Sequence, residues 1–173
     1  MYLTGERIKL RAPEPTDLDL MYGVENDTSL WSVGMGVTPY SRHLLQLFIE
    51  ESAHDLFIDR QLRMMIVDKE TEEVLGMVDL SDFDPMHRRA AVGVLVLPAY
   101  RNKGIATEAV SLLTTYSFQL LQLHQLYAYI PVTNGASKAV FEKSGFIQSS
   151  CLIDWLSTAE GFIDAFFLQI ING

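Results

Sequence analysis

Residues 90–106, which read AAVGVLVLPAYRNKGIA, constrain the fold of this chain more than any other segment. An apolar run typical of a strand leads through a short turn, with Arg101, Lys103 and Gly104, into a helix-forming stretch. The first N–H groups of a helix lack intrahelical acceptors and lie at the positive end of the helix dipole. A turn of this kind, with two basic side chains beside it, predicts a site for an anion such as pyrophosphate.

The two commonest phosphate-binding loops are not found at this turn. A Walker loop needs the pattern G-x-x-x-x-G-K-[ST], but Gly104 is followed by IATE. A dinucleotide-binding fingerprint needs three glycines, and one glycine stands here. The pattern that remains is R-x-x-G-x-A, from Arg101 to Ala106.

This pattern resembles the phosphate loop of the GNAT N-acetyltransferase superfamily, which is usually [QR]-x-x-G-x-[GA]. Residues 134–146, NGASKAVFEKSGF, are similar to a second superfamily segment, N-x-x-[AS]-x-x-x-[YF]-x-K-x-G-F. Residues 87–90 and 103–109 resemble a bacterial subgroup that includes spermidine acetyltransferases and ribosomal-protein N-terminal acetyltransferases. The resemblance covers the whole chain loosely and residues 74–147 closely.

The resemblance implies an enzyme, an acyltransferase that moves an acetyl group from acetyl-CoA to a primary amine by direct attack. A small cationic amine, with a polyamine as the leading candidate, is the expected acceptor. Two alternatives stay open, a protein N-terminal acetyltransferase of the ribosomal type and a weakly active acyl-CoA-binding paralogue. Acetyl-CoA is the expected cosubstrate, and no metal is expected.

Coenzyme contacts follow from the same resemblance. The pyrophosphate is expected on the backbone N–H groups of residues 102–107, and the pantetheine arm is expected to add as a strand along residues 94–96. Asn134 is also a good N-cap for the helix that follows it. The expected coenzyme-binding residues are Val94, Leu95, Val96, Arg101, Asn102, Lys103, Gly104, Ile105, Ala106, Thr107, Asn134, Lys138 and Phe141.

Catalytic groups are harder to assign. The resemblance places a backbone N–H, that of Val94, at the thioester oxygen, where such a donor is worth about 2.7–4 kcal/mol. Many relatives carry a Tyr at the position of Phe141 and a Glu at the position of Ala91, so two polar groups are missing. General acid–base assistance usually contributes about 10²–10⁴-fold. Catalysis through solvent is therefore possible but slow.

Asp79 is the leading candidate for a replacement catalyst. We expect it at the end of the strand that pairs with the central one, in the place of a family Glu, although a turn-forming Asp is the simpler interpretation. Five other side chains are weaker candidates, with loop or packing roles as the alternatives: Asp82, Asp84, His87, Tyr127 and Tyr129.

Charge divides the chain into two halves. The net charge is −9, and residues 1–87 hold 17 acidic and 7 basic side chains, whereas residues 88–173 hold 5 and 6. The acidic excess makes nucleic acid an unsuitable partner. The resemblance implies one domain over residues 1–173: residues 1–87 mainly form the acceptor side, 88–147 the acetyl-CoA-binding core and 148–173 the closing strands. An acidic acceptor side suits a cationic amine, and solvated surface charge is the alternative.

A cytoplasmic location is expected. The first residues, MYLTGER, lack the pattern of a signal peptide, and no apolar run approaches the roughly 20 residues of a membrane helix, so no membrane contact is expected. The single cysteine suits a reducing compartment. The partner is expected to be a small-molecule amine or a peptide N-terminus, and a homo-oligomer stays open.

Residue patterns predict an α/β (α+β) fold of alternating elements. A mixed, mostly antiparallel twisted sheet of about six to seven strands, with helices on both faces, is expected. The expected helices span residues 17–24, 41–58, 104–121 and 134–144. The expected strands span residues 6–12, 62–68, 73–80, 89–97, 125–131, 146–153 and 162–171. A turn is expected at 81–86 and an open loop at 31–36.

Overall fold

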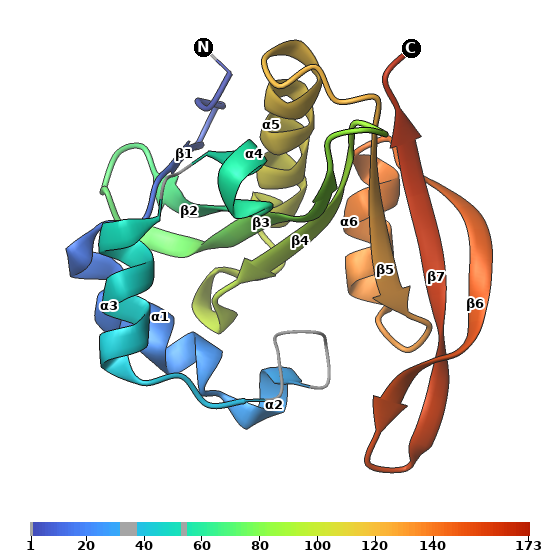
Figure 1. The fold of residues 1–173 in the computed structure, drawn as a ribbon, viewed down its shortest axis with the longest axis horizontal. Helices are drawn as coiled ribbons and strands as arrows, with labels where there is room; N and C mark the ends of the chain where they lie inside the picture. The colour runs from blue at the N-terminus through green and yellow to red at the C-terminus, as the bar shows by residue number, and fades with distance from the viewer. Residues whose placement is uncertain (1, 32–37, 53–54) are drawn as a thin grey trace.

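The computed structural model describes residues 2–31, 38–52 and 55–173. In this part of the chain seven strands form one sheet in the order β1-β2-β3-β4-β5-β7-β6 (Figure 1). Strand β4 takes the central place that the sequence predicts. The strands are β1 (Ile8–Arg11), β2 (Leu62–Asp68), β3 (Val74–Asp84), β4 (Arg89–Val96), β5 (Gln125–Pro131), β6 (Ile147–Thr158) and β7 (Gly161–Ile171).

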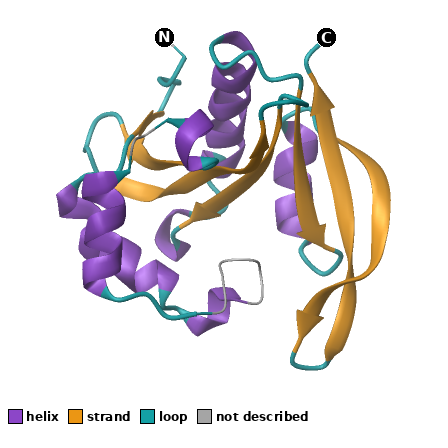
Figure 2. Cartoon of the chain, in the orientation of Figure 1, coloured by secondary structure: helices purple, strands orange, loops and turns teal. Residues whose placement is uncertain are grey.

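Helices cover both faces of the sheet (Figure 2). Strand residues alternate between two apolar clusters: Val78 and Val92 face the side with α5, whereas Met65 and Met77 face the side with α1 and α3. The helices are α1 (Leu18–Glu25), α2 (Thr28–Trp31), α3 (Arg42–Glu51), α4 (Leu56–Asp59), α5 (Ile105–Gln119) and α6 (Gly135–Lys143), with 3₁₀ turns η1 (Pro15–Asp17) and η2 (Pro98–Tyr100). The predicted fold class is confirmed.

The sheet opens between its two central strands. Parallel strands β4 and β5 pair at Arg89, Ala90 and Ala91, the last opposite Tyr127, and no further pair joins them among the described residues. Beyond this point they diverge, as Figure 1 shows. We call this opening the fork. It leads toward the turn that joins β4 to α5.

Several predicted elements differ in their extent. The strand predicted at 146–153 is longer, as β6 over Ile147–Thr158, and the strand predicted at 6–12 is shorter, as β1 over Ile8–Arg11. The helix predicted at 41–58 is two helices, α3 and α4: Ser52 is the C-cap of α3, and the side chain of Asp55 accepts a hydrogen bond from Phe57 N at 2.8 Å to begin α4. Residues 53–54 lie outside the described part. The predicted N-cap of α3 is confirmed, because Ser41 Oγ accepts from Leu44 N at 3.1 Å.

The turn predicted at 81–86 is largely strand. Strand β3 continues to Asp84 because its register with β4 shifts between Ser81 and Asp84, where Asp82 takes a φ of 49°. A bulge therefore absorbs the turn-forming residues without ending the strand. Trp31 closes α2, and the rest of the loop predicted at 31–36 lies outside the described residues.

Among the described residues, the structure contains no helix of the length and apolarity that a membrane span requires.

Candidate coenzyme and acceptor site

The turn between β4 and α5 has an unusual backbone. Asn102 and Gly104 both take positive φ angles, 60° and 78°. Gly104 is the N-cap of α5, and because it has no side chain, no side-chain cap covers the first N–H groups of the helix. Residues 101–104 are exposed. The predicted anion turn is therefore formed with its N–H donors uncapped by any side chain.

Two basic side chains lie on this turn, as predicted. The Nε of Arg101 donates to the carbonyl oxygen of Val96 at 3.0 Å, which holds the base of the arginine against the end of β4. The Nζ of Lys103 lies 5.6 Å from the centre of the Tyr100 ring. Tyr100 in turn donates its hydroxyl to Glu73, and this hydrogen bond raises the pKa of Tyr100. Both cations remain close to the turn.

The side chain of Arg7, which lies just before β1, contacts this turn. The Nη1 of Arg7 donates to the carbonyl oxygen of Lys103 at 2.6 Å, and its Nη2 lies 3.0 Å from the point where a Cβ on Gly104 would stand. Sequence reasoning assigned Arg7 to an alternating strand and missed this role. No local signal could have revealed it, because 96 positions separate Arg7 from Lys103.

Residues 94–96 form the wall of the fork on the β4 side. They pair with β3 as Val94 with Val78 and Val96 with Gly76. On the β5 side the described ladder ends at Ala91, three residues earlier. The strand therefore has an open edge of the kind that an extended ligand can pair with. The N–H of Val94 as a carbonyl donor stays a prediction.

Helix α6 presents its predicted residues in different ways. Asn134 Oδ1 accepts from Ser137 N at 3.0 Å, which confirms its N-cap role. Lys138 forms an ion pair with Glu142 at 3.1 Å, so a coenzyme phosphate would compete for it. Phe141 is 2 % exposed and packs edge-on against Phe146 at 5.0 Å between ring centres. The coenzyme contacts of Asn134 and Lys138 stay predictions. The burial of Phe141 argues against a contact between its side chain and the coenzyme.

Asp79 lies in the middle of β3, opposite Gly93 of β4, and is neither at a strand end nor in a turn. Both of its carboxylate oxygens accept from Arg63, at 2.9 Å each, and Arg63 also pairs with Glu25 at the end of α1. Burial acts to lower the pKa of Arg63, but the two carboxylates outweigh it and raise the pKa. A Cβ on Gly93 would meet no atom within 4 Å. Asp79 thus stands next to open space.

The weaker candidates have structural partners. Asp84 accepts from His87 N at 3.0 Å and pairs with Arg89 at 3.3 Å, and the first of these contacts is the main cause of its lowered pKa. Burial, together with the charges around it, raises the pKa of Tyr127 to about 12. A phenol with this pKa keeps its proton at neutral pH, so Tyr127 is not a general base there.

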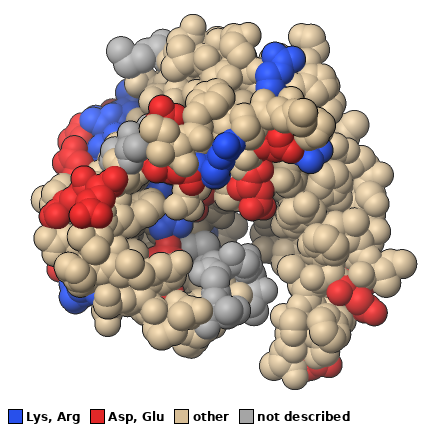
Figure 3. Space-filling model, in the orientation of Figure 1, with Lys and Arg blue, Asp and Glu red and all other residues tan. Residues whose placement is uncertain are grey.

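A cleft borders the site on the helix side. It has a volume of about 360 Å³ and lies between α1, α2 and the end of β4, with Leu95, Leu97 and Arg101 in its wall. Figure 3 shows a hollow between the part of the molecule that carries α1 to α3 and the part that carries β5 to β7. The cleft therefore lies between the predicted phosphate turn, at Arg101, and helices α1 and α2, which belong to the predicted acceptor side.

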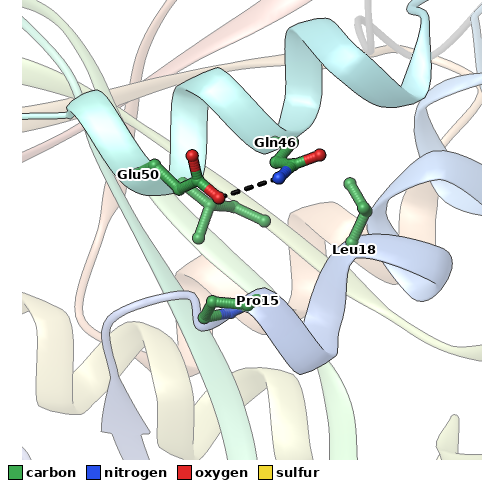
Figure 4. Close-up of a pocket in the computed structure, with 5 residues that line it drawn as sticks. Pro15, Leu18, Gln46 and Glu50 are labelled. Atoms are coloured by element: carbon green, nitrogen blue, oxygen red, sulfur yellow. Dashed lines mark hydrogen bonds between the residues drawn. The ribbon is translucent and has the colours of Figure 1, made fainter.

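Another cavity, of about 170 Å³, is unrelated to this site. It lies between the start of α1 and helix α3, and Figure 4 shows Pro15, Leu18, Gln46 and Glu50 around it. Gln46 donates to Glu50 at 2.9 Å there. None of the predicted site residues lines it. Across residues 2–31, 38–52 and 55–173, no group of three or more His, Cys, Asp or Glu side chains is placed to hold a metal ion.

Several known proteins are similar to this chain. The spermidine N(1)-acetyltransferase of Escherichia coli K12 is 31% identical over 83% of this chain and 74% of its own length. The crystal structure of the spermidine N-acetyltransferase of Vibrio cholerae in complex with CoA and spermine superposes with a TM-score of 0.86, at 23% identity and 97% coverage of both chains. A dodecameric structure of the V. cholerae enzyme gives a TM-score of 0.81 at 23% identity, covering 97% of this chain and 95% of that one.

The family model of the acetyltransferase (GNAT) domain matches residues 7–147. This range contains both the turn between β4 and α5 and helix α6, which carry the two motifs. It covers well over half of the 173 residues. The chain therefore belongs to the GNAT acetyltransferase family, and it is an acetyl-CoA-dependent acyltransferase.

Proposed function

We propose that this enzyme transfers the acetyl group of acetyl-CoA to a primary amine of a polyamine. The observation that carries the proposal is the fork between β4 and β5, which ends at an exposed turn with uncapped helix N–H groups. An extended thioester fits the fork, and its pyrophosphate fits the turn. The related enzymes from E. coli and V. cholerae are spermidine acetyltransferases, which supports a polyamine acceptor.

The coenzyme is held mainly by backbone groups. The N–H groups of residues 102–107 bind the pyrophosphate, with Arg101 and Lys103 as charge partners. The pantetheine arm pairs with residues 94–96, and Asn134 and Lys138 lie at the start of α6 on the other side of the coenzyme. In this division residues 1–87 supply the acceptor side, 88–147 the coenzyme core and 148–173 the closing strands of one domain.

The reaction is a direct transfer. The neutral amine nitrogen attacks the thioester carbon, and the N–H of Val94 stabilises the oxyanion that forms, a contribution of about 2.7–4 kcal/mol. The C–S bond then breaks, the coenzyme leaves as a thiolate, and the new amide nitrogen loses its proton to solvent. A thiol pKa near 8.5 makes the thiolate a tolerable leaving group without a protein acid.

Asp79 acts as a positioning residue in this scheme, not as a base. Because Arg63 donates to both of its oxygens, the carboxylate is already held in a bidentate ion pair. The carboxylate still contributes negative charge beside the open space at Gly93, which favours a cationic amine. This assignment revises the expectation that Asp79 replaces a missing catalyst.

Two further properties belong to the proposal. The protein forms a homo-oligomer, supported by the dodecameric structure of a related enzyme and by exposed apolar side chains such as Ile147 and Ile153, 67% and 80% exposed. It works in the cytoplasm, a reducing compartment that suits a chain with a single cysteine. Both are separate from the chemistry at the fork.

Thiol release in the presence of acetyl-CoA tests the acceptor. Spermidine, spermine and a panel of peptides with free N-termini are compared under steady-state conditions. Turnover of the polyamines at a kcat/KM at least about a hundredfold above that of the peptides is expected. Turnover of the peptides alone would replace the polyamine proposal by N-terminal acetylation, because both acceptors use the same fork.

The weakly active paralogue is tested by calorimetry on the same protein. The buried Phe141 and the apolar Ala91 favour slow chemistry, since neither can move a proton. Binding of acetyl-CoA without thiol release for any amine would identify a coenzyme-binding protein. Binding with turnover supports the enzyme.

A further inference from the structure

Four aromatic rings form a continuous cluster on β5, β6 and β7. Tyr129 is in contact with three others: its ring centre lies 5.5 Å from that of Tyr127, 5.5 Å from that of Trp155 and 5.2 Å from that of Phe167. Tyr127 and Phe167 are 5.5 Å apart as well. The Tyr129 and Trp155 rings are stacked, with 30° between their planes. We call these four residues the aromatic wall.

The wall faces the acceptor side of the fork. Leu126, Ala128 and Ile130 of β5 belong to the apolar cluster packed on α5, so the alternate residues Tyr127 and Tyr129 point to the opposite face. Tyr127 pairs with Ala91 at the last rung before the strands diverge. Tyr129 is two residues farther along, on the side of the fork that lies across from Gly93 and Asp79.

Much of the wall is open to solvent. Trp155 is 51% exposed and Tyr129 is 40% exposed. A cluster of large exposed apolar rings costs free energy in water and usually marks a binding surface. Three charged groups act on the Tyr127 hydroxyl: Asp82, Asp84 and Arg89, two carboxylates and one guanidinium. The charge beside the wall is therefore negative, and a cationic ligand is favoured over a neutral or anionic one.

We propose that the aromatic wall binds the ammonium groups and methylene chain of the polyamine acceptor, with Tyr129 and Trp155 as specificity-determining residues. This inference rests on the proposed function and adds the part of the protein that selects the substrate. A polyamine alternates charged nitrogens with short apolar chains. Aromatic faces attract the nitrogens through their quadrupoles and cover the methylenes, and the nearby carboxylates add long-range attraction.

The wall lies on β5, which stands between the two coenzyme motifs in the sequence, and on β6 and β7, which follow them. It is opposite the α1–α3 side to which sequence reasoning assigned the acceptor. The acceptor site therefore has two sides. Asp79 and the acidic first half stand on one, and the wall stands on the other. An amine held between them meets the thioester at the divergence of β4 and β5.

Replacement of Trp155 tests the wall by comparing its effect on the KM for spermidine with its effect on the KM for acetyl-CoA. The variant Trp155→Leu should raise the KM for spermidine by about fivefold or more and leave the KM for acetyl-CoA unchanged. Trp155→Phe keeps an aromatic face and should retain most of the affinity. Phe162→Leu is the matched control, because Phe162 is an exposed aromatic on β7 without a ring contact to the wall, and it should match the wild type.

A series of fluorinated rings at position 155 separates cation–π attraction to the ammonium groups from packing against the methylene chain. Tryptophans with one, two and three ring fluorines, placed at position 155, keep the shape of the ring but weaken its negative face. Stepwise increases in the KM for spermidine are expected, with no such trend for an alkyl monoamine of the same length. Equal KM values across the series would overturn the inference.

The outcomes for the wall and for the proposed function can be told apart. If spermidine is acetylated and Trp155→Leu leaves its KM unchanged, the wall is wrong and the proposed function stands. If no amine is acetylated, calorimetry measures the Kd of spermidine for the wild type and for Trp155→Leu. Equal Kd values would overturn the inference about the wall. A change of oligomeric state in Trp155→Leu with unchanged spermidine binding would instead make the wall a contact between copies of this chain.

Discussion

The carboxylate of Glu108 accepts hydrogen bonds from both the backbone N–H and the guanidinium Nε of Arg7, at 2.9 and 3.2 Å. It also accepts from Ile8 N at 3.3 Å. The first turn of α5 is thereby joined to the start of β1, and Arg7 is oriented so that its Nη1 reaches the carbonyl of Lys103. Arg7, just before β1, thus supports the turn predicted to bind the coenzyme, although it touches none of the predicted coenzyme-binding N–H groups.

Loss of the Arg7 side chain should loosen this turn. In Arg7→Met the carbonyl of Lys103 loses its donor, and we expect the Kd for acetyl-CoA to rise about fivefold, the value of one hydrogen bond. The KM for the amine should stay the same. Calorimetry with acetyl-CoA measures the first quantity. Lys9→Met is the control, because Lys9 lies two residues farther along, in β1, and pairs with Glu72, away from the turn. A coenzyme Kd equal in both variants contradicts the support role.

Substitution of Gly104 should damage the same turn more directly. Its φ of 78° disfavours any side chain, and a Cβ would stand 3.0 Å from Arg7 Nη2. We expect Gly104→Ala to weaken acetyl-CoA binding about tenfold or more and to destabilise the fold by about 1 kcal/mol. Gly135→Ala is the matched control, since a Cβ there meets nothing within 4 Å and Ala favours a helix. Unchanged coenzyme binding in Gly104→Ala would show that the turn does not hold the pyrophosphate.

Local patterns were sufficient for much of the fold and for the turn between β4 and α5, whose coenzyme binding stays a prediction. Strands at 62–68 and 125–131 have the predicted bounds, and Ser41 and Asn134 cap their helices as predicted. These features depend on residues a few positions apart, where alternation and capping act. The single helix predicted at 41–58 is wrong because the prediction used apolar spacing alone. That spacing continues across the boundary between α3 and α4, where Asp55 caps the start of a second helix.

The rest of the site depends on contacts between distant segments. Arg63 reaches Asp79 across 16 residues and Glu25 across 38, so this ion-pair network has no sequence signature. Asp79 appeared to be a turn residue because Ser81, Asp82 and Asp84 follow it, and the bulge that keeps them in β3 depends on pairing with β4. The aromatic wall likewise joins three strands. Tertiary pairing, not local preference, sets these positions.

Neutralisation of Asp79 distinguishes a positioning residue from a base. In Asp79→Asn we expect kcat/KM for spermidine to fall less than about tenfold, because a lost general base usually costs about 10²–10⁴-fold. The acidic limb of the pH–rate profile should remain where it is in the wild type. Glu25→Gln is the control, since Glu25 binds the same guanidinium. If the acidic limb of the pH–rate profile is lost in Asp79→Asn but kept in Glu25→Gln, Asp79 is the general base.

Asp17, in η1, should govern the acid stability of the helix layer that η1 forms with α1 and α3. Its side chain is 4% exposed; burial alone would raise its pKa, but the hydrogen bonds from Arg11, at 2.7 and 3.1 Å, and from Glu14 N outweigh burial and lower the pKa below the ordinary 3.8. A lowered folded-state pKa contributes stability that is complete above the ordinary pKa and is lost as the pH falls through the folded value.

Asp17→Asn should therefore lower the free energy of unfolding by about 1–3 kcal/mol at pH 7. The difference from the wild type should shrink as the pH falls below 3.8, because the wild-type carboxyl then takes up a proton as well. Urea unfolding at a series of pH values measures this difference. Asp19→Asn is the control: its carboxylate is 83% exposed, and its pair with Arg42 lies at the surface, so little change is expected at any pH. A difference between Asp17→Asn and the wild type that stays constant down to pH values well below 3.8 would show that Arg11 does not stabilise the charged form of Asp17.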